Sequence, residues 1–186
     1  MIIVNSLWAR SSINNLKDPT NLGIIAGTFI KLPHGCLLVA SVYWPIPSKP
    51  DVPSFSDALW RRLQAYLRRT RQSEVDPLFF IQRLIMRIVT THMSTPGNMV
   101  TLSGDFNSEW TTLHRATHPA LQPWAEYNLW ANGLAEGMDP DTDFHSRWAT
   151  PERPTSWIDH ILHRIPPEVS CVGGRGVRGN DLGRNI

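Results

Sequence analysis

The sequence has few of the features that mark secreted, disulfide-stabilised or membrane proteins. Its only two cysteines, Cys36 and Cys171, are far apart and not in a metal-binding spacing, which indicates reduced thiols inside a cell. No apolar stretch approaches the ~20 residues that cross a bilayer, and residues 1–8 lack the basic start and cleavage site of a signal peptide. We therefore expect an intracellular protein without a membrane segment, in either nucleus or cytoplasm.

Net charge and length set further bounds. The formal charge is only +2, so no global electrostatic field requires nucleic acid as a partner. A chain of 186 residues is long enough for one domain with a real core. We find no internal repeat, low-complexity tract or linker, and we treat residues 1–186 as a single domain.

Apolar runs and turn signals predict a layered α/β arrangement. Strands are expected at residues 2–4, 22–30, 36–43, 99–103 and 156–162, with a hairpin turn at residues 31–35. Helical spacing predicts helices at residues 54–69 and 119–131. A third helix should start at Asp76 as N-cap with Pro77 in its first turn, and should stop before Pro96.

The tetrapeptide at residues 104–107, Gly-Asp-Phe-Asn, places two functional groups at a strand exit. Residues i and i+2 share a face of a strand, so Asp105 and Asn107 are able to aim at one point. A carboxylate at this place activates water, and an amide holds the water or a phosphate oxygen. Taken alone, the tetrapeptide more often marks a turn.

Two companion segments strengthen the functional interpretation. Residues 41–45, Ser-Val-Tyr-Trp-Pro, carry Tyr43 at the end of an apolar run, and residues 155–162, Thr-Ser-Trp-Ile-Asp-His-Ile-Leu, carry Ser156 and Asp159. Each alone is weak, since Tyr43 fits an ordinary strand aromatic and Asp159 a turn acid. Their order along the chain is the informative feature.

With these three motifs the chain resembles the endonuclease/exonuclease/phosphatase superfamily of metal-dependent phosphodiesterases, also called DNase I-like, over most of residues 22–162. The resemblance implies a four-layer α/β sandwich, with two sheets packed face to face and helices outside. It also implies Mg²⁺ or Mn²⁺ as cofactor.

The resemblance implies a role for each matching residue. Asp105 would orient and deprotonate the attacking water, and Asn107 would hydrogen-bond the nucleophile or the phosphate. The Tyr43 hydroxyl would stabilise the transition state, and Asp159 would orient a histidine. Asn107 and Ser156 are the expected substrate-binding residues.

Two parts of the family pattern are missing. The metal-binding glutamate should precede Tyr43, but the only acid in residues 1–50 is Asp18, which lies before Pro19 in a polar stretch. The terminal Ser-Asp-His is also absent. His160 is a poor substitute, because strand neighbours point to opposite faces and Asp159 would aim away from it.

We therefore expect a partial domain that begins and ends inside the fold, with unidentified metal ligands. As this chain it should be weakly active or inactive, and it fits part of a larger polyprotein. If strands are missing at both ends, the strands that would pair with them become open edges. We therefore expect the chain to be poorly soluble, partly molten or dependent on a partner.

Three functions stay open. Phe106 favours a nucleic-acid endonuclease domain like those attached to reverse transcriptases, on DNA or RNA. Ser156 followed by tryptophan also suits a phosphoinositide or sugar-phosphate phosphatase, although His160 replaces the arginine of that pattern. A non-catalytic, decayed copy is the third.

The arginines of the first helix are interpreted as a solvent-exposed face: Arg61, Arg62, Arg68, Arg69 and Arg71.

Overall fold

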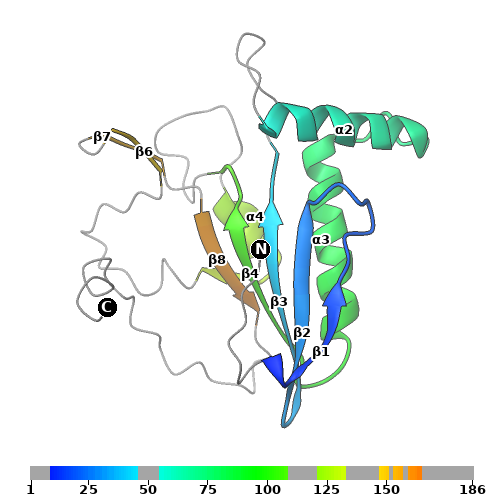
Figure 1. The fold of residues 1–186 in the computed structure, drawn as a ribbon, viewed down its shortest axis with the longest axis vertical. Helices are drawn as coiled ribbons and strands as arrows, with labels where there is room; N and C mark the ends of the chain where they lie inside the picture. Colours follow the sequence, from blue (N-terminus) through cyan, green and yellow to red (C-terminus); the bar gives the residue numbers. More distant parts are fainter. Residues whose placement is uncertain are drawn as a thin grey trace.

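A six-stranded mixed sheet with helices packed on it forms the core of the protein (Figure 1). The computed structural model describes residues 9–45, 55–108, 121–132, 147–150, 153–156 and 159–164. The strand order is β1-β2-β3-β4-β8-β5, with bounds Ser12–Leu16, Ile25–Leu32, Gly35–Tyr43, Met99–Asp105, Asp159–Arg164 and Ala131–Asn132. A separate two-stranded sheet pairs β6 (Arg147–Thr150) with β7 (Arg153–Ser156). The expected α/β class is therefore confirmed.

Strands β2 and β3 form the predicted hairpin. They pair antiparallel from Ile25 with Val42 to Leu32 with Gly35. A two-residue turn, Pro33 and His34, joins them, as the turn signals in residues 31–35 predict. Strand β2 starts three residues later than predicted, because residues 18–24 form a loop held by the carboxylate of Asp18.

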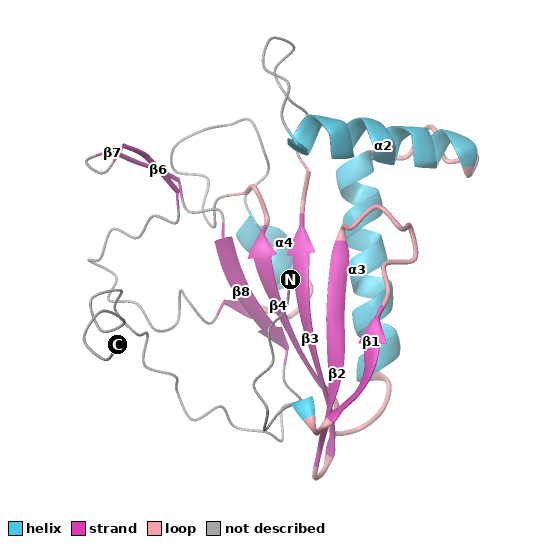
Figure 2. Cartoon of the chain, in the orientation of Figure 1, coloured by secondary structure: helices cyan, strands magenta, loops and turns pink. Residues whose placement is uncertain are grey.

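Two helices connect β3 to the parallel strand β4. Helix α2 spans Phe55–Arg69 and α3 spans Pro77–Met93 (Figure 2). Parallel neighbours need such a crossover, because a tight turn cannot return the chain to the same end of the sheet. Helix α3 starts as predicted: Pro77 occupies the first turn and the Asp76 side chain accepts a hydrogen bond from the Phe79 N–H at 2.9 Å.

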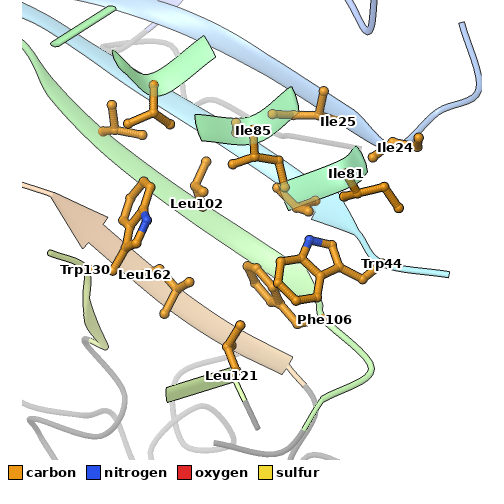
Figure 3. Close-up of a cluster of buried hydrophobic side chains, with 14 of the residues drawn as sticks. Ile24, Ile25, Trp44, Ile81, Ile85, Leu102, Phe106, Leu121, Trp130 and Leu162 are labelled. Atoms are coloured by element: carbon orange, nitrogen blue, oxygen red, sulfur yellow. The ribbon is translucent and has the colours of Figure 1, made fainter. Parts of the chain in front are cut away.

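One face of the sheet carries the apolar core. Paired residues of β2, β3, β4 and β8 place buried side chains on this face. These side chains pack against α3 and against α4, which spans Leu121–Tyr127 (Figure 3). Period-two alternation in the strands produces this face. The core includes Ile25, Leu38, Ala40, Val42, Trp44, Ile81, Ile85, Val100, Leu102, Leu121 and Leu162.

The opposite face of the same strands is half-buried. It holds Val39 and Ser41 of β3 beside Thr101 and Ser103 of β4. Besides the six-stranded sheet, the described residues form one two-stranded sheet, β6–β7, so the four-layer sandwich stays a prediction.

Several elements differ from the sequence-based prediction. Strand β1 was missed because its four leading residues are exposed and give no apolar alternation. The predicted helix at 119–131 is α4 alone, followed by a turn and β5. The predicted strand at 156–162 starts at Asp159, while Ser156 ends β7. The strand predicted at residues 2–4 lies outside the described residues.

A search of the helices in the described ranges found none that combines the length and the apolar character needed to span a bilayer.

Candidate functional site

Three of the predicted site residues lie in one row across neighbouring strands. Tyr43 is the last residue of β3 and pairs with Asp105, the last residue of β4. Asp105 pairs in turn with Asp159, the first residue of β8. Neighbouring strands lie ≈ 4.8 Å apart and paired positions share a face of the pleat. We call this set the strand-edge row.

The fourth predicted residue, Asn107, closes a clamp between β3 and β4. The Trp44 N–H donates to the Asp105 backbone oxygen at 3.0 Å. The Asn107 side-chain Nδ2 donates to the Trp44 backbone oxygen at 2.8 Å, and the Asn107 N–H donates to Asp105 Oδ1 at 2.9 Å. We call these three bonds the Trp44–Asp105–Asn107 clamp; the bond from the Asn107 N–H is the one that holds the Asp105 carboxylate.

The clamp limits what Asn107 offers to a ligand. One Nδ2 hydrogen serves the Trp44 carbonyl, and an amide carries a second hydrogen and a carbonyl oxygen. Asn107 also adopts a left-handed backbone conformation with φ 48°, which asparagine tolerates better than most residues. Its predicted contact with the nucleophile or phosphate therefore has to share the side chain with a structural role.

Gly104 lets β4 approach β3 at the row. Its φ is 145°, and a Cβ atom there would collide with the backbone oxygen of Val42. The sequence suggested that Gly104 begins a loop after a strand ending at Ser103. The structure instead continues β4 through Gly104 to Asp105, because the glycine permits pairing with β3.

His160 belongs to the core and not to the row. It pairs with Gly104, one position away from Asp159, and is 1% exposed. Its Nε2 lies 2.9 Å from the Ser108 backbone oxygen, and its ring packs edge-on against Phe106 at 5.9 Å. His160 and Asp159 are successive positions of β8, where side chains alternate between faces; that Asp159 aims away from His160 stays a prediction.

Aromatic side chains pack around Trp44 of the clamp; Figure 3 labels Trp44, Phe106 and Trp130. Trp44 is 1% exposed and meets Phe106 and Trp124 edge-on, each at 5.2 Å between ring centres. Trp124 stacks in turn on Trp130 at 6.3 Å. Trp130 belongs to the core cluster and Trp124 packs against it. The core role of Trp44 was missed, although its place directly after the apolar strand was a usable signal.

The predicted residue Ser156 is not joined to the row by the described structure, and neither is Asp18, which the sequence did not assign to the site. Ser156 ends β7, which is not hydrogen-bonded to the six-stranded sheet. Asp18 holds its own loop: its carboxylate accepts hydrogen bonds from the N–H and hydroxyl of Thr20 and from the N–H groups of Gly23 and Ile24, at 2.6–2.8 Å. Asp18 is therefore a loop-closing acid, as its context before Pro19 suggested.

The described residues do not form a complete metal site. Among them, no group of three or more His, Cys, Asp or Glu side chains is arranged to hold an ion. Hard cations such as Mg²⁺ need several oxygen ligands, of which protein carboxylates supply one or two and substrate and water the rest. The donors of the described residues do not by themselves reach that set.

A scan against protein-family models found no match for the chain, and a search of curated proteins found none either. The functional interpretation therefore depends on the residues and their geometry.

Proposed function

We propose that this chain is a phosphodiester hydrolase domain of the endonuclease/exonuclease/phosphatase type that acts on nucleic acid. The observation that carries the proposal is the strand-edge row. Three motifs that are far apart in the sequence place Tyr43, Asp105 and Asp159 at paired positions of three adjacent strands. Such convergence is what a catalytic edge requires and what an unrelated set of turn residues would not produce.

The chemistry follows from the groups in the row. The Asp105 carboxylate, oriented by the Asn107 N–H, would accept the proton of the attacking water. The Tyr43 hydroxyl would donate to a phosphate oxygen as negative charge develops in the transition state. Mg²⁺ or Mn²⁺ shared with the substrate phosphates remains the cofactor that the family resemblance predicts.

The half-buried face of β3 and β4 supports the sandwich architecture that belongs to this proposal. Val39 and Thr101 pair across the two strands, as do Ser41 and Ser103. A face of mixed small polar and apolar residues suits burial against a second sheet. The row would then lie at the edge between two sheets.

A hydrolysis assay on the purified chain tests the function. The substrates are supercoiled plasmid and an activated phosphodiester, each with Mg²⁺ or Mn²⁺. Because the family glutamate and terminal histidine are absent, we expect slow turnover. Asp105→Asn and Tyr43→Phe should each lower it by about tenfold or more.

The outcomes separate the candidates. Turnover that is unaffected by Asp105→Asn would remove the strand-edge row from the chemistry. Turnover of an inositol phosphate and not of plasmid would select the phosphoinositide or sugar-phosphate phosphatase. No turnover above the protein-free rate with either metal would select the non-catalytic copy.

A further inference from the structure

A groove runs along α3 on the side of the molecule that holds β1 and β2. It consists of two hollows of ≈ 600 Å³ and ≈ 420 Å³, both lined by Arg87 and Thr91. The larger reaches the end of α2 through Tyr66, and the smaller reaches the sheet through Leu16 and Phe29. We call the pair the α3 groove. None of its lining residues lies on β3, β4 or β8, so the groove is separate from the strand-edge row.

The groove is positively charged. Arg83 and Arg87 both line the larger hollow, and among the described residues no Asp or Glu lines either hollow. Residues four apart on a helix are neighbours on its surface, about 6 Å apart. Both arginines are exposed, so their guanidinium groups are accessible to an anion. Guanidinium groups bind phosphate oxygens through paired N–H donors.

Aromatic and hydroxyl groups accompany the charge. The rings of Tyr66 and Phe80 both line the larger hollow and lie 5.8 Å apart with a 52° tilt. The Arg69 guanidinium, which is not itself part of the lining, lies 5.7 Å from the centre of the Tyr66 ring. Thr90 and Thr91 add hydroxyl groups to the lining.

We propose that the α3 groove binds a single strand of nucleic acid, with phosphates on Arg83 and Arg87 and a base against the Tyr66–Phe80 pair. A positive groove combined with aromatic rings is the arrangement that single-stranded nucleic acid uses. Two adjoining hollows that share Arg87 fit a chain of nucleotides better than one small anion. A duplex keeps its bases paired and stacked, so an unpaired strand is what would bring a base to the Tyr66–Phe80 pair.

A binding assay tests the proposal without any need for turnover. The probe is a fluorescently labelled oligothymidylate of about 12 nucleotides, titrated with the chain in the presence of a metal chelator. The chelator makes the result independent of whether the strand-edge row hydrolyses phosphodiesters.

Substitution of the groove arginines should weaken binding. Arg83→Ala combined with Arg87→Ala should raise Kd by about tenfold or more. It should also make the slope of log K against log salt shallower by about 1.4, the value for two single-strand phosphate contacts at about 0.7 each. Tyr66→Leu, which keeps apolar bulk but removes the ring, should raise Kd by about fivefold or more.

The matched control is Arg61→Ala combined with Arg62→Ala. These two arginines are also exposed and helical, and their removal changes the net charge equally, but they do not line the groove. We expect a change in Kd below about threefold. Unfolding midpoints near that of the parent chain for all variants show that binding is lost without loss of fold.

Three results would overturn the proposal. An equal loss of binding in the control pair would show a diffuse surface field. Competition by polyglutamate as effective as that by unlabelled oligothymidylate would indicate an acidic peptide as the occupant. Displacement of the probe by inorganic phosphate at a concentration similar to that of unlabelled oligothymidylate would show that the groove binds a single anion and not a nucleotide chain.

Discussion

At the scale of single residues, Asn107 stabilises the fold through its side chain and through its backbone conformation, and mutation separates the two contributions to the free energy of unfolding. Its side chain bonds the Trp44 carbonyl, and its backbone holds φ at 48°. Alanine loses the bond and resists the left-handed conformation, whereas glycine loses the bond and accepts the conformation.

We therefore predict that Asn107→Ala lowers the free energy of unfolding by about 2 kcal/mol and Asn107→Gly by about 1 kcal/mol. Urea unfolding of the three proteins measures both values. If Asn107→Ala unfolds at the same urea concentration as the parent, the Trp44–Asp105–Asn107 clamp contributes nothing to stability.

Cys36 gives a pH-dependent prediction at the same scale. Burial raises the pKa of the Cys36 thiol, and a backbone hydrogen bond at Ile30 opposes the rise in part. A thiol whose pKa is raised in the folded state keeps its proton to higher pH than in the unfolded chain. Its contribution to stability is complete below the unfolded pKa and is lost as pH rises through the folded pKa.

In a Cys171→Ser chain, where Cys36 is the remaining thiol, the alkylation rate of the folded protein should rise with pH at a higher midpoint than in urea. The folded chain should also lose stability at alkaline pH, and Cys36→Ser should remove that part of the loss. Equal midpoints for folded and unfolded chains would contradict the raised pKa.

At the scale of elements, the pairing of β3 with β4 depends on a missing side chain. A Cβ at Gly104 would meet the Val42 backbone, which cannot move without breaking the sheet. Gly23 also has a positive φ, of 83°, but a Cβ there would meet nothing within 4 Å. Alanine at Gly23 would therefore cost backbone strain alone, whereas alanine at Gly104 would add a steric collision to that strain.

Gly104→Ala should cost about 4 kcal/mol or more, in the range of strongly disruptive substitutions, while Gly23→Ala should cost about 1 kcal/mol. Chemical unfolding followed by circular dichroism compares them. Similar losses for both would show that β3 and β4 separate easily at this end.

How much of each element was predictable depends on the range of the signal. The start of α3 was predicted correctly because Asp76 and Pro77 act within one turn. Strand β1 was not, because its exposed side chains carry no alternation and its only support is pairing with β2. Continuation of β4 to Asp105 was missed for the same reason, since it depends on Val42 of another strand.

At the scale of the whole molecule, one core joins the sheet to the three helices α2, α3 and α4. Leu102 is fully buried in this cluster, together with residues of α3 and the aromatic side chains of Trp44, Phe106 and Trp130. Side chains that share a core are expected to lose their packing together.

Leu102→Ala should therefore lower the free energy of unfolding by about 2–5 kcal/mol, and tryptophan fluorescence and helical circular dichroism should still report one transition. Leu129→Ala is the matched control, because Leu129 is 72% exposed, and it should change stability by less than about 0.5 kcal/mol. Separate transitions for the two probes would show that the surroundings of the tryptophans and the helices unfold independently.

The sequence by itself determined the features that depend on neighbours along the chain: the β2–β3 hairpin, the helical periodicity of α2 and α3, and the capping by Asp76. The tertiary structure alone decided which strands lie side by side beyond that hairpin. It also decided that Tyr43, Asp105 and Asp159 are paired, that the Asn107 amide serves the Trp44 carbonyl 63 positions away, and that Arg83 and Arg87 line a groove. Turns and caps are selected by interactions within a few residues, whereas pairing between distant strands is selected by burial of the whole core, which no single segment of sequence contains.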